Sequence, residues 1–218
     1  MPLTREQMAR RAAQELHDGA YVNLGIGIPM LVANYVPSGI EVFLHSGHGI
    51  LGVGPFPDPD EIDPDLVSVG TLPATIVAGA SLFSTADSFD MIRSGKIELA
   101  IMGALQVSER GDLASWAVTG RPPHGMGGAM DLAASAKRIV VVMEHVTRSG
   151  EPRIVRECGH PLTGAACVDR VISDLCVLDI TSNGITLVEL APGTTVDDVQ
   201  RQTEPSLIAP SSVPSMKI

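Results

Sequence analysis

Short apolar runs alternate with segments of helical period along most of the 218-residue chain. Several runs are apolar at nearly every position, which is typical of strands buried on both faces of a parallel sheet. The expected strands cover residues 20–24, 42–45, 75–79, 97–105, 112–116, 138–143, 153–156, 170–180 and 185–190. Several of these runs lead into glycine, which predicts turns at the edge of the sheet.

The segments between the runs predict helices at residues 4–18, 30–35, 84–93, 132–137 and 195–202. Because strands and helices alternate, we expect an α/β fold with an open, largely parallel sheet. Asn183-Gly184 is a hairpin signal, so we also expect an antiparallel flank. No linker divides the sequence, and we expect residues 1–218 to form a single domain with a mobile Pro/Ser-rich tail at about residues 205–218.

Composition narrows the class of protein. The residues are 44% hydrophobic but only 3% aromatic, so the core must be aliphatic. The formal charge of −10 and the lack of a long Lys/Arg run argue against nucleic acid or an anionic membrane as partner. Cys158, Cys167 and Cys176 have no metal or disulfide spacing, and no apolar run reaches the length of a membrane span. We therefore expect a soluble, cytoplasmic protein with reduced thiols.

Residues 41–55 form the most informative segment. An apolar run ends at His45 and changes abruptly to glycine, histidine and proline. In open α/β sheets, ligands bind beyond the carboxyl ends of the strands, so this turn is a candidate site. His45 itself is expected to be a packed residue rather than a catalyst, and His145 is expected to support the end of another strand.

Two glycine clusters precede expected helices. Residues 25–30 resemble the start of a dinucleotide fingerprint, but Met30 takes the place of its last glycine and no suitable acidic residue follows. A tight turn and a ligand-binding loop are both open for this cluster. Gly127, Gly128 and Ala129 would expose backbone N–H groups that bind an anion or a developing oxyanion, although close helix packing would also explain them.

Three segments together resemble the small (B, or β) subunit of family I CoA-transferases of the succinyl-CoA:3-oxoacid and 3-oxoadipate type. They are residues 21–29, 50–55 and 125–132, and residues 103–108, 111–114 and 161–164 extend the match. The resemblance implies the open α/β fold of that family and an A (α) subunit as partner in a heterotetramer, with the active site between the subunits. It also implies that backbone N–H groups at Gly128 and Ala129 hold the thioester oxygen.

The resemblance breaks at the residue that should carry the chemistry. The nucleophile of the family is the glutamate of a Ser-Glu-Asn-Gly motif directly after the strand that corresponds to residues 42–45. Here the motif reads Ser46-Gly47-His48-Gly49, so Gly47 stands at the position of the glutamate. Transfer of CoA through a covalent intermediate needs such a nucleophile. Neither Glu41, Glu144 nor His48 looks like a substitute, because the first two lie at other strand positions and an acyl-imidazole would hydrolyse.

The first hypothesis is therefore decarboxylation of a glutaconyl-type CoA thioester, as in a methylglutaconyl-CoA decarboxylase built on this fold. Loss of carbon dioxide gives a dienolate whose charge reaches the thioester oxygen, where N–H dipoles stabilise it. Gly47 leaves space for the substrate carboxylate and places no like charge beside it. His48 either holds that carboxylate, reprotonates the dienolate or only fills the turn. The alternatives are a CoA-transferase with its nucleophile supplied elsewhere, and a noncatalytic partner subunit.

These hypotheses name the following site residues. The catalytic candidates are Ser46, Gly47 and His48; the candidates for binding the thioester oxygen are Gly127, Gly128 and Ala129; and those for binding substrate or CoA are Gly25, Gly27, Gly49, Gly52 and Gly54. No set of His, Asp and Glu has metal-ligand spacing, so no metal is expected. No permanently bound cofactor is expected either, because CoA enters as part of the substrate.

Overall fold

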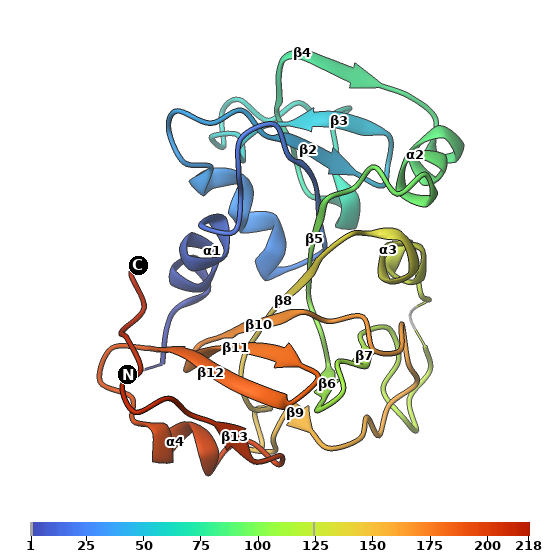
Figure 1. Ribbon diagram of the computed structural model, residues 1–218. Helices are drawn as coiled ribbons and strands as arrows, with labels where there is room; N and C mark the ends of the chain where they lie inside the picture. The colour runs from blue at the N-terminus through green and yellow to red at the C-terminus, as the bar shows by residue number, and fades with distance from the viewer. Residues whose placement is uncertain (1, 124) are drawn as a thin grey trace.

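The computed structural model describes residues 2–123 and 125–218. Its centre is a ten-stranded sheet with the order β13-β12-β11-β10-β8-β5-β1-β2-β3-β4 (Figure 1). The strands are β1 (Tyr21–Leu24), β2 (Phe43–Ser46), β3 (Ile50–Val53), β4 (Ile76–Leu82), β5 (Leu99–Met102), β8 (Ile139–Met143), β10 (Arg170–Ser173), β11 (Cys176–Thr181), β12 (Gly184–Leu190) and β13 (Leu207–Ile208). A second, three-stranded sheet contains β6 (Gln106–Ser108), β7 (Leu113–Ala114) and β9 (Ile154–Val155).

Strand directions confirm the expected α/β fold with a largely parallel sheet. The central strands β10, β8, β5, β1 and β2 are all parallel to one another. The hairpin of β11 and β12 turns at Asn183 and adds the expected antiparallel flank. A second antiparallel flank, β2-β3-β4, lies at the other edge of the sheet and was not expected from the sequence.

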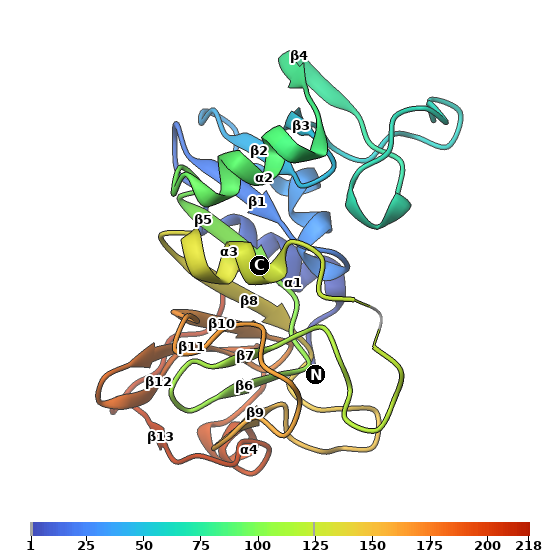
Figure 2. The ribbon, with the colours of Figure 1, turned by 90° about the vertical axis from the view of Figure 1, so that its right-hand side faces the viewer.

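Helices cover both faces of the sheet. The first face carries α1 (Arg5–Ala13) and the 3₁₀ helix η1 (Ile28–Tyr35), and the other carries α2 (Thr85–Arg93) and α3 (Ala129–Ser135) (Figures 1 and 2). Side chains of β5 alternate between the two cores, with Leu99 and Ile101 on the α1 side and Ala100 and Met102 on the other. The remaining helices are η2 (Val69–Thr71) and α4 (Val196–Gln200).

One expected strand is in fact two. The apolar run 170–180 contains no glycine or proline, but the chain reverses between β10 and β11. The Ser173 hydroxyl accepts hydrogen bonds from the backbone N–H groups of Leu175 and Cys176, at 3.2 and 3.1 Å. A serine side chain therefore closes this turn in place of the usual turn residues.

The C-terminal residues, expected to be a mobile tail, pack against the sheet instead. Strand β13 pairs with β12, and Ser215 forms a bridge with Leu190. Met216 is only 4% exposed, and the Gln14 side chain donates a hydrogen bond to the carbonyl of Lys217. Two apolar residues of this Pro/Ser-rich segment anchor it, since Met216 is buried in one core cluster and Leu207 is half-buried against the other.

Two further expectations concern the thiols and the membrane. Cys176 is buried and Cys158 and Cys167 are half-buried, and all three are free thiols. Burial raises their pKa to about 11 for Cys158 and Cys167 and to about 12 for Cys176. Within the described ranges, no helix has both the length and the apolar character needed to cross a membrane.

Candidate functional site

A cavity of about 640 Å³ lies beyond the carboxyl ends of β1, β2 and β5. This volume is within the range of small-molecule sites. Its described lining residues come from seven segments of the chain: Asn23, Leu24, Gly25 and Ile26; Gly47 and His48; Val69; Thr85, Phe89 and Ile92; Met102, Gly103, Ala104 and Leu105; Ser115 and Trp116; and Gly125, Met126, Gly127, Gly128, Ala129 and Leu132.

The turn between β2 and β3 forms one wall of this cavity. It is a three-residue hairpin loop, in which the N–H of Gly49 donates to the carbonyl of Ser46 at 3.0 Å. Gly49 has φ of +103°, and a Cβ there would lie 2.1 Å from the carbonyl oxygen of Phe83. Glycine is therefore required at position 49.

Gly47, in the same turn, is different. Its φ lies outside the positive region, and a Cβ built on it would have no heavy atom within 4 Å. The residue lines the cavity, so the space beside it is the space of the site. The fold would accept a side chain at position 47, and glycine is not needed there for backbone reasons.

A chain of buried hydrogen bonds holds this turn from below. The Asn23 amide donates to Nδ1 of His45 at 2.8 Å, and Nε2 of His45 lies 3.0 Å from Oγ of Ser88. The Ser88 hydroxyl in turn donates to the carbonyl of Ser46 at 3.2 Å. Because the Ser88 hydroxyl uses its proton for the Ser46 carbonyl, it must accept a hydrogen bond from Nε2 of His45. His45 is therefore neutral with its proton on Nε2, and burial lowers its pKa to about 4. As expected, His45 is packed, and it connects β1, β2 and α2.

His145 forms a similar buried arrangement away from the cavity. Its Nδ1 lies 2.9 Å from Oγ of Ser173 and its Nε2 lies 2.8 Å from Oγ1 of Thr203. Because the Thr203 hydroxyl donates to the carbonyl of Val199, it accepts from a neutral His145. Burial lowers the pKa of His145 to about 4, and the residue supports the end of β8 as expected.

These two histidines predict a loss of stability in mild acid. Each has a pKa near 4 in the folded state, against 6.5 for an unperturbed histidine, so the unfolded chain binds more protons between these values. The free energy of unfolding should be highest above pH 6.5 and should fall towards pH 4, by up to about 2.7 kcal/mol per pH unit with both residues titrating. Urea midpoints measured from about pH 7 down to pH 5 test this, since most carboxylates stay ionised there. His145→Gln should remove about half of the slope. A midpoint that stays constant over this range would contradict the assignment.

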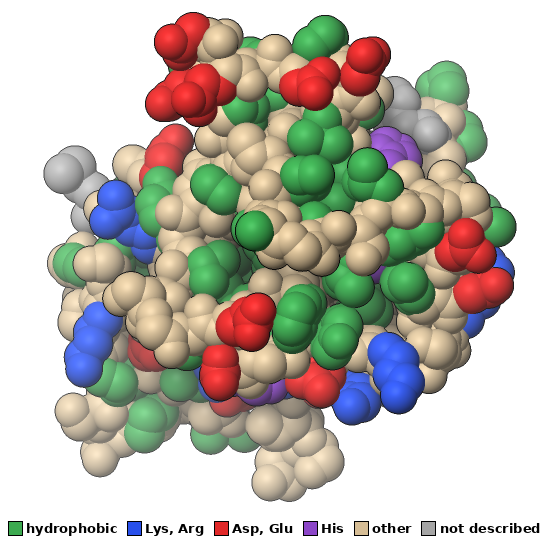
Figure 3. All heavy atoms as spheres, turned by 90° about the horizontal axis from the view of Figure 1, so that it is seen from above, with side chains coloured by type: hydrophobic (Ala, Val, Ile, Leu, Met, Phe, Trp, Pro, Cys, Tyr) green, Lys and Arg blue, Asp and Glu red, His purple; other side chains and the backbone are tan. Residues whose placement is uncertain are grey.

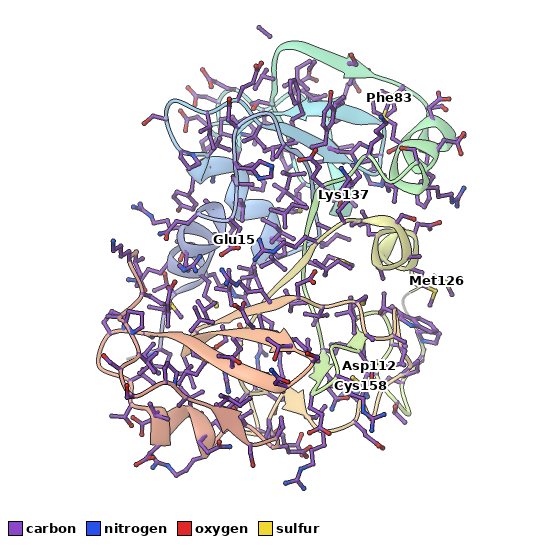
Figure 4. The ribbon with its side chains drawn as sticks, in the orientation of Figure 1. Glu15, Phe83, Asp112, Met126, Lys137 and Cys158 are labelled. Atoms are coloured by element: carbon purple, nitrogen blue, oxygen red, sulfur yellow. The ribbon has the colours of Figure 1, made fainter. Side chains whose placement is uncertain are left out.

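Helices α2 and α3 form the opposite wall, and they lie side by side in Figure 2. Gly128 is the N-cap of α3, and a Cβ on it would lie 3.1 Å from Cζ of Phe89 in α2. The missing side chain therefore lets the Phe89 ring approach the start of α3. Met126 lies at the outer end of this wall and is 45% exposed (Figure 4).

The described lining carries no Asp, Glu, Lys or Arg, although the chain has a net charge of −10. Acidic residues of the neighbouring helices are engaged elsewhere. Asp87 completes the capping box of α2 with Ser84, and Asp131 of α3 pairs with Arg93 at 2.7 Å. The titratable group among the described lining residues is the imidazole of His48, which is exposed. No group of three or more His, Cys, Asp or Glu side chains in the described ranges could hold a metal ion.

The cavity brings together part of the predicted set. Its lining includes Gly25, Gly47, His48, Gly127, Gly128 and Ala129. The other predicted site residues lie outside the described lining. The Ser46 hydroxyl accepts hydrogen bonds from the Ser68 hydroxyl and from the Val69 N–H. Gly27 is the N-cap of η1. Gly49 and Gly52 pack against Phe83 and Ala80, and Gly54 packs against Thr75 beside a separate cavity of about 20 Å³.

Several lining residues were missed in the sequence. Asn23 precedes the first glycine cluster, and a polar residue inside a buried strand was the available signal for it. Phe89 lies in the expected helix 84–93, but nothing local in the sequence indicated that its side chain borders a cavity. Trp116, whose indole donates to the carbonyl of Leu162 at 3.1 Å, follows a strand of only two residues and had no distinguishing pattern.

Comparison with known proteins gives the family. The protein-family model described as coenzyme A transferase matches residues 5–202 of this chain. The chain is 49% identical to the B subunit of a probable succinyl-CoA:3-ketoacid coenzyme A transferase from Bacillus subtilis (strain 168), over 98% of this chain and 99% of that protein. It is 47% identical to the mitochondrial succinyl-CoA:3-ketoacid coenzyme A transferase 2B of Mus musculus, over 99% of this chain but only 42% of that longer protein.

Solved structures share the fold at low identity. An acyl-CoA transferase from E. coli O157:H7, in a thioester complex with CoA, superposes with a TM-score of 0.77 at 20% identity, over 99% of this chain and 44% of that one. The decarboxylase AibA/AibB superposes with a TM-score of 0.69 at 18% identity, over 99% and 89% of the two chains. The expected fold of the CoA-transferase type is confirmed. With the family model spanning most of its length, the chain belongs to the coenzyme A transferase family.

Proposed function

We propose that this chain is the B subunit of a heteromeric CoA-transferase that moves CoA from an acyl-CoA donor to a 3-oxo acid. The cavity is the observation that carries the proposal. It joins residues 25–26, 47–48 and 125–129, which belong to three segments far apart in the sequence. Residues 25–26 and 125–129 belong to two of the segments that carry the family resemblance, and residues 47–48 lie just before the third, residues 50–55. CoA enters the site as part of the substrate, and no resident cofactor is involved.

Identity favours transfer over the decarboxylation that we first expected. The Bacillus relative, named as part of a transferase, is 49% identical over nearly the whole chain. The decarboxylase is 18% identical, and its likeness extends to the fold only. The 3-oxo acid is taken from the names of the relatives and is the part of the proposal that a substrate panel must test.

An A subunit is the proposed partner. The mouse relative is more than twice the length of this chain, which leaves room in one polypeptide for a second unit of similar size. Exposed apolar side chains also support a partner near the cavity. They include Ile26 at 61% exposure, Leu82 at 64% and Val77 at 48%. Seen from above, the face that carries β4 has hydrophobic side chains across its middle and acidic side chains flanking them (Figure 3). Such a patch on a monomer is typical of an interface.

The test uses the chain purified with its A subunit. Succinyl-CoA and a 3-oxo acid are mixed with the pair, and products are followed by mass. Appearance of the 3-oxoacyl-CoA and free succinate, with no carbon lost, supports the proposal. If neither substrate changes while the pair remains assembled, the transferase assignment fails.

Decarboxylation remains a second candidate because of one observation, the uncharged lining around Gly47. A substrate carboxylate placed there would meet no like charge from the described residues. In that reaction His48 would hold the carboxylate or reprotonate the dienolate. A glutaconyl-type CoA incubated with the same pair should then release carbon dioxide, and His48→Ala should slow the release by about 100-fold if the imidazole transfers the proton. Full activity of His48→Ala would remove this role.

A further inference from the structure

The space beside Gly47 faces the candidate site and is open. A Cβ built on Gly47 would have no heavy atom within 4 Å other than those of its chain neighbours. The space belongs to a cavity whose described lining carries no acidic or basic side chain apart from the imidazole of His48. A transferase nevertheless needs a nucleophile that can attack the donor thioester. The question is which group can reach this space.

The described protein groups near the cavity are poor candidates. Asp87 and Asp131 are hydrogen-bonded to Ser84 and Arg93, outside the lining. His45 has both ring nitrogens engaged below the turn. Cys167 lies outside the lining, and burial keeps its thiol protonated, since its pKa is raised to about 11. An attacking carboxylate can, however, enter from solution, because one substrate of the proposed reaction is a carboxylate.

We propose that the space beside Gly47 is a binding subsite for the carboxylate of the acceptor acid, which attacks the donor thioester directly. The inference rests on the proposed transferase function and deepens it. CoA transfer in this chain is then sequential, with both substrates bound together, and no acyl or CoA group becomes attached to the protein. His48 and Thr85 line the same cavity and carry an N–H and an O–H group that can donate to a carboxylate.

The steps balance without any further reactant. An oxygen of the acceptor carboxylate forms a bond to the thioester carbonyl carbon, the C–S bond breaks, and the CoA thiolate leaves with the electron pair. The product of this step is a mixed anhydride of donor and acceptor. The thiolate then attacks the acceptor carbonyl carbon of the anhydride, the C–O bond on that carbon breaks, and the donor leaves as a carboxylate. One oxygen atom has passed from the acceptor to the donor acid.

Oxygen labelling in a single turnover tests this route. The assembled pair, in excess over succinyl-CoA, is mixed with a 3-oxo acid whose carboxylate carries oxygen-18. Direct attack places one oxygen-18 atom in the succinate released in the first turnover. If a carboxylate of either chain is the nucleophile, the first succinate takes its oxygen from the protein and is unlabelled, which overturns the inference while leaving transfer intact. Absence of any transfer overturns the proposed function and the inference with it.

Substitutions at position 47 give an independent measurement. Gly47→Gln fills the subsite with a side chain that cannot attack, and it should reduce transfer by at least about tenfold, mainly through a higher KM for the acceptor. Gly47→Glu has the same size but supplies a nucleophile, so succinyl-CoA alone should leave CoA on this chain as a mass increase. Gly159→Ala, at a loop glycine outside the cavity lining, is the control for the substitution itself. Unchanged kinetics in Gly47→Gln, with the melting temperature preserved, would show that the acceptor does not bind there.

Discussion

Gly49→Ala is expected to lower the free energy of unfolding by about 3 kcal/mol or more, whereas Gly47→Ala should change it by less than about 0.5 kcal/mol. The two glycines lie in the same three-residue turn, so local sequence context is nearly identical. At position 49 the methyl group would meet the Phe83 carbonyl oxygen at 2.1 Å, on a backbone with φ of +103°. At position 47 it would meet nothing within 4 Å.

Denaturant unfolding of the wild type and of both variants measures this difference, with the slope m checked to be unchanged. Equal losses of stability in the two variants would mean that the turn has another conformation. They would contradict the assignment of open space beside Gly47. Because that space underlies the acceptor subsite, this stability measurement also checks the geometry on which the kinetic proposal depends.

The contrast between the two glycines also bears on the difference that the family resemblance implies at position 47. A glycine required by backbone geometry would say little about chemistry. Gly47 has an ordinary φ and open surroundings, so the fold does not demand it. Its consequence lies in the reaction: it removes any side chain from the wall of the cavity. On the proposed transferase function, the nucleophile would then come from a substrate or from the partner.

The location of the cavity that forms the candidate site could be predicted from the sequence, because strand ends and glycines mark it. Apolar runs ending near residues 24, 45 and 102 become the parallel strands β1, β2 and β5, and the carboxyl ends of parallel strands meet at one edge. The glycine cluster at residues 127–128 reaches the same cavity because it begins a helix on one face of this sheet. Periodicity and turn residues are local signals, and these features are local.

Other features depend on contacts that sequence patterns do not contain. The glycine-rich segment that contains Gly52 was expected to be a turn, but it forms strand β3. It is a strand because it pairs with the exposed strand β4, where Ala80, 28 positions later, lies against Gly52. The hydrogen bonds that join His45 to Asn23 and to Ser88 connect residues 22 and 43 positions apart. Such pairs are fixed by how the sheet and α2 come together, and a single sequence gives no measure of that arrangement.

Glu15→Gln should be the most damaging change outside the site, with an expected loss in the free energy of unfolding of about 3 kcal/mol. The Glu15 side chain is 6% exposed and accepts from Arg11, Arg138 and Arg170 at 2.8, 2.7 and 2.8 Å. Burial would raise the pKa of Glu15, but the three guanidinium groups outweigh it and the pKa is lowered. Figure 4 shows Glu15 between α1 and the sheet strands beneath it.

The loss follows from what the substitution leaves behind. An amide has nearly the same shape as the carboxylate, so packing is kept while three arginines lose a shared negative charge. Arg11 retains Glu189 and Arg170 retains Asp179, which limits the effect to the lower part of the range for buried ion pairs. Glu144→Gln is the matched control, because its carboxylate contacts Arg5 and Arg153 but is 38% exposed, and it should cost less than about 1 kcal/mol. Denaturant unfolding at pH 7 compares the two variants. Similar small losses in both would show that water screens the Glu15 cluster, and the apolar residues of α1 would then be its main attachment to the sheet.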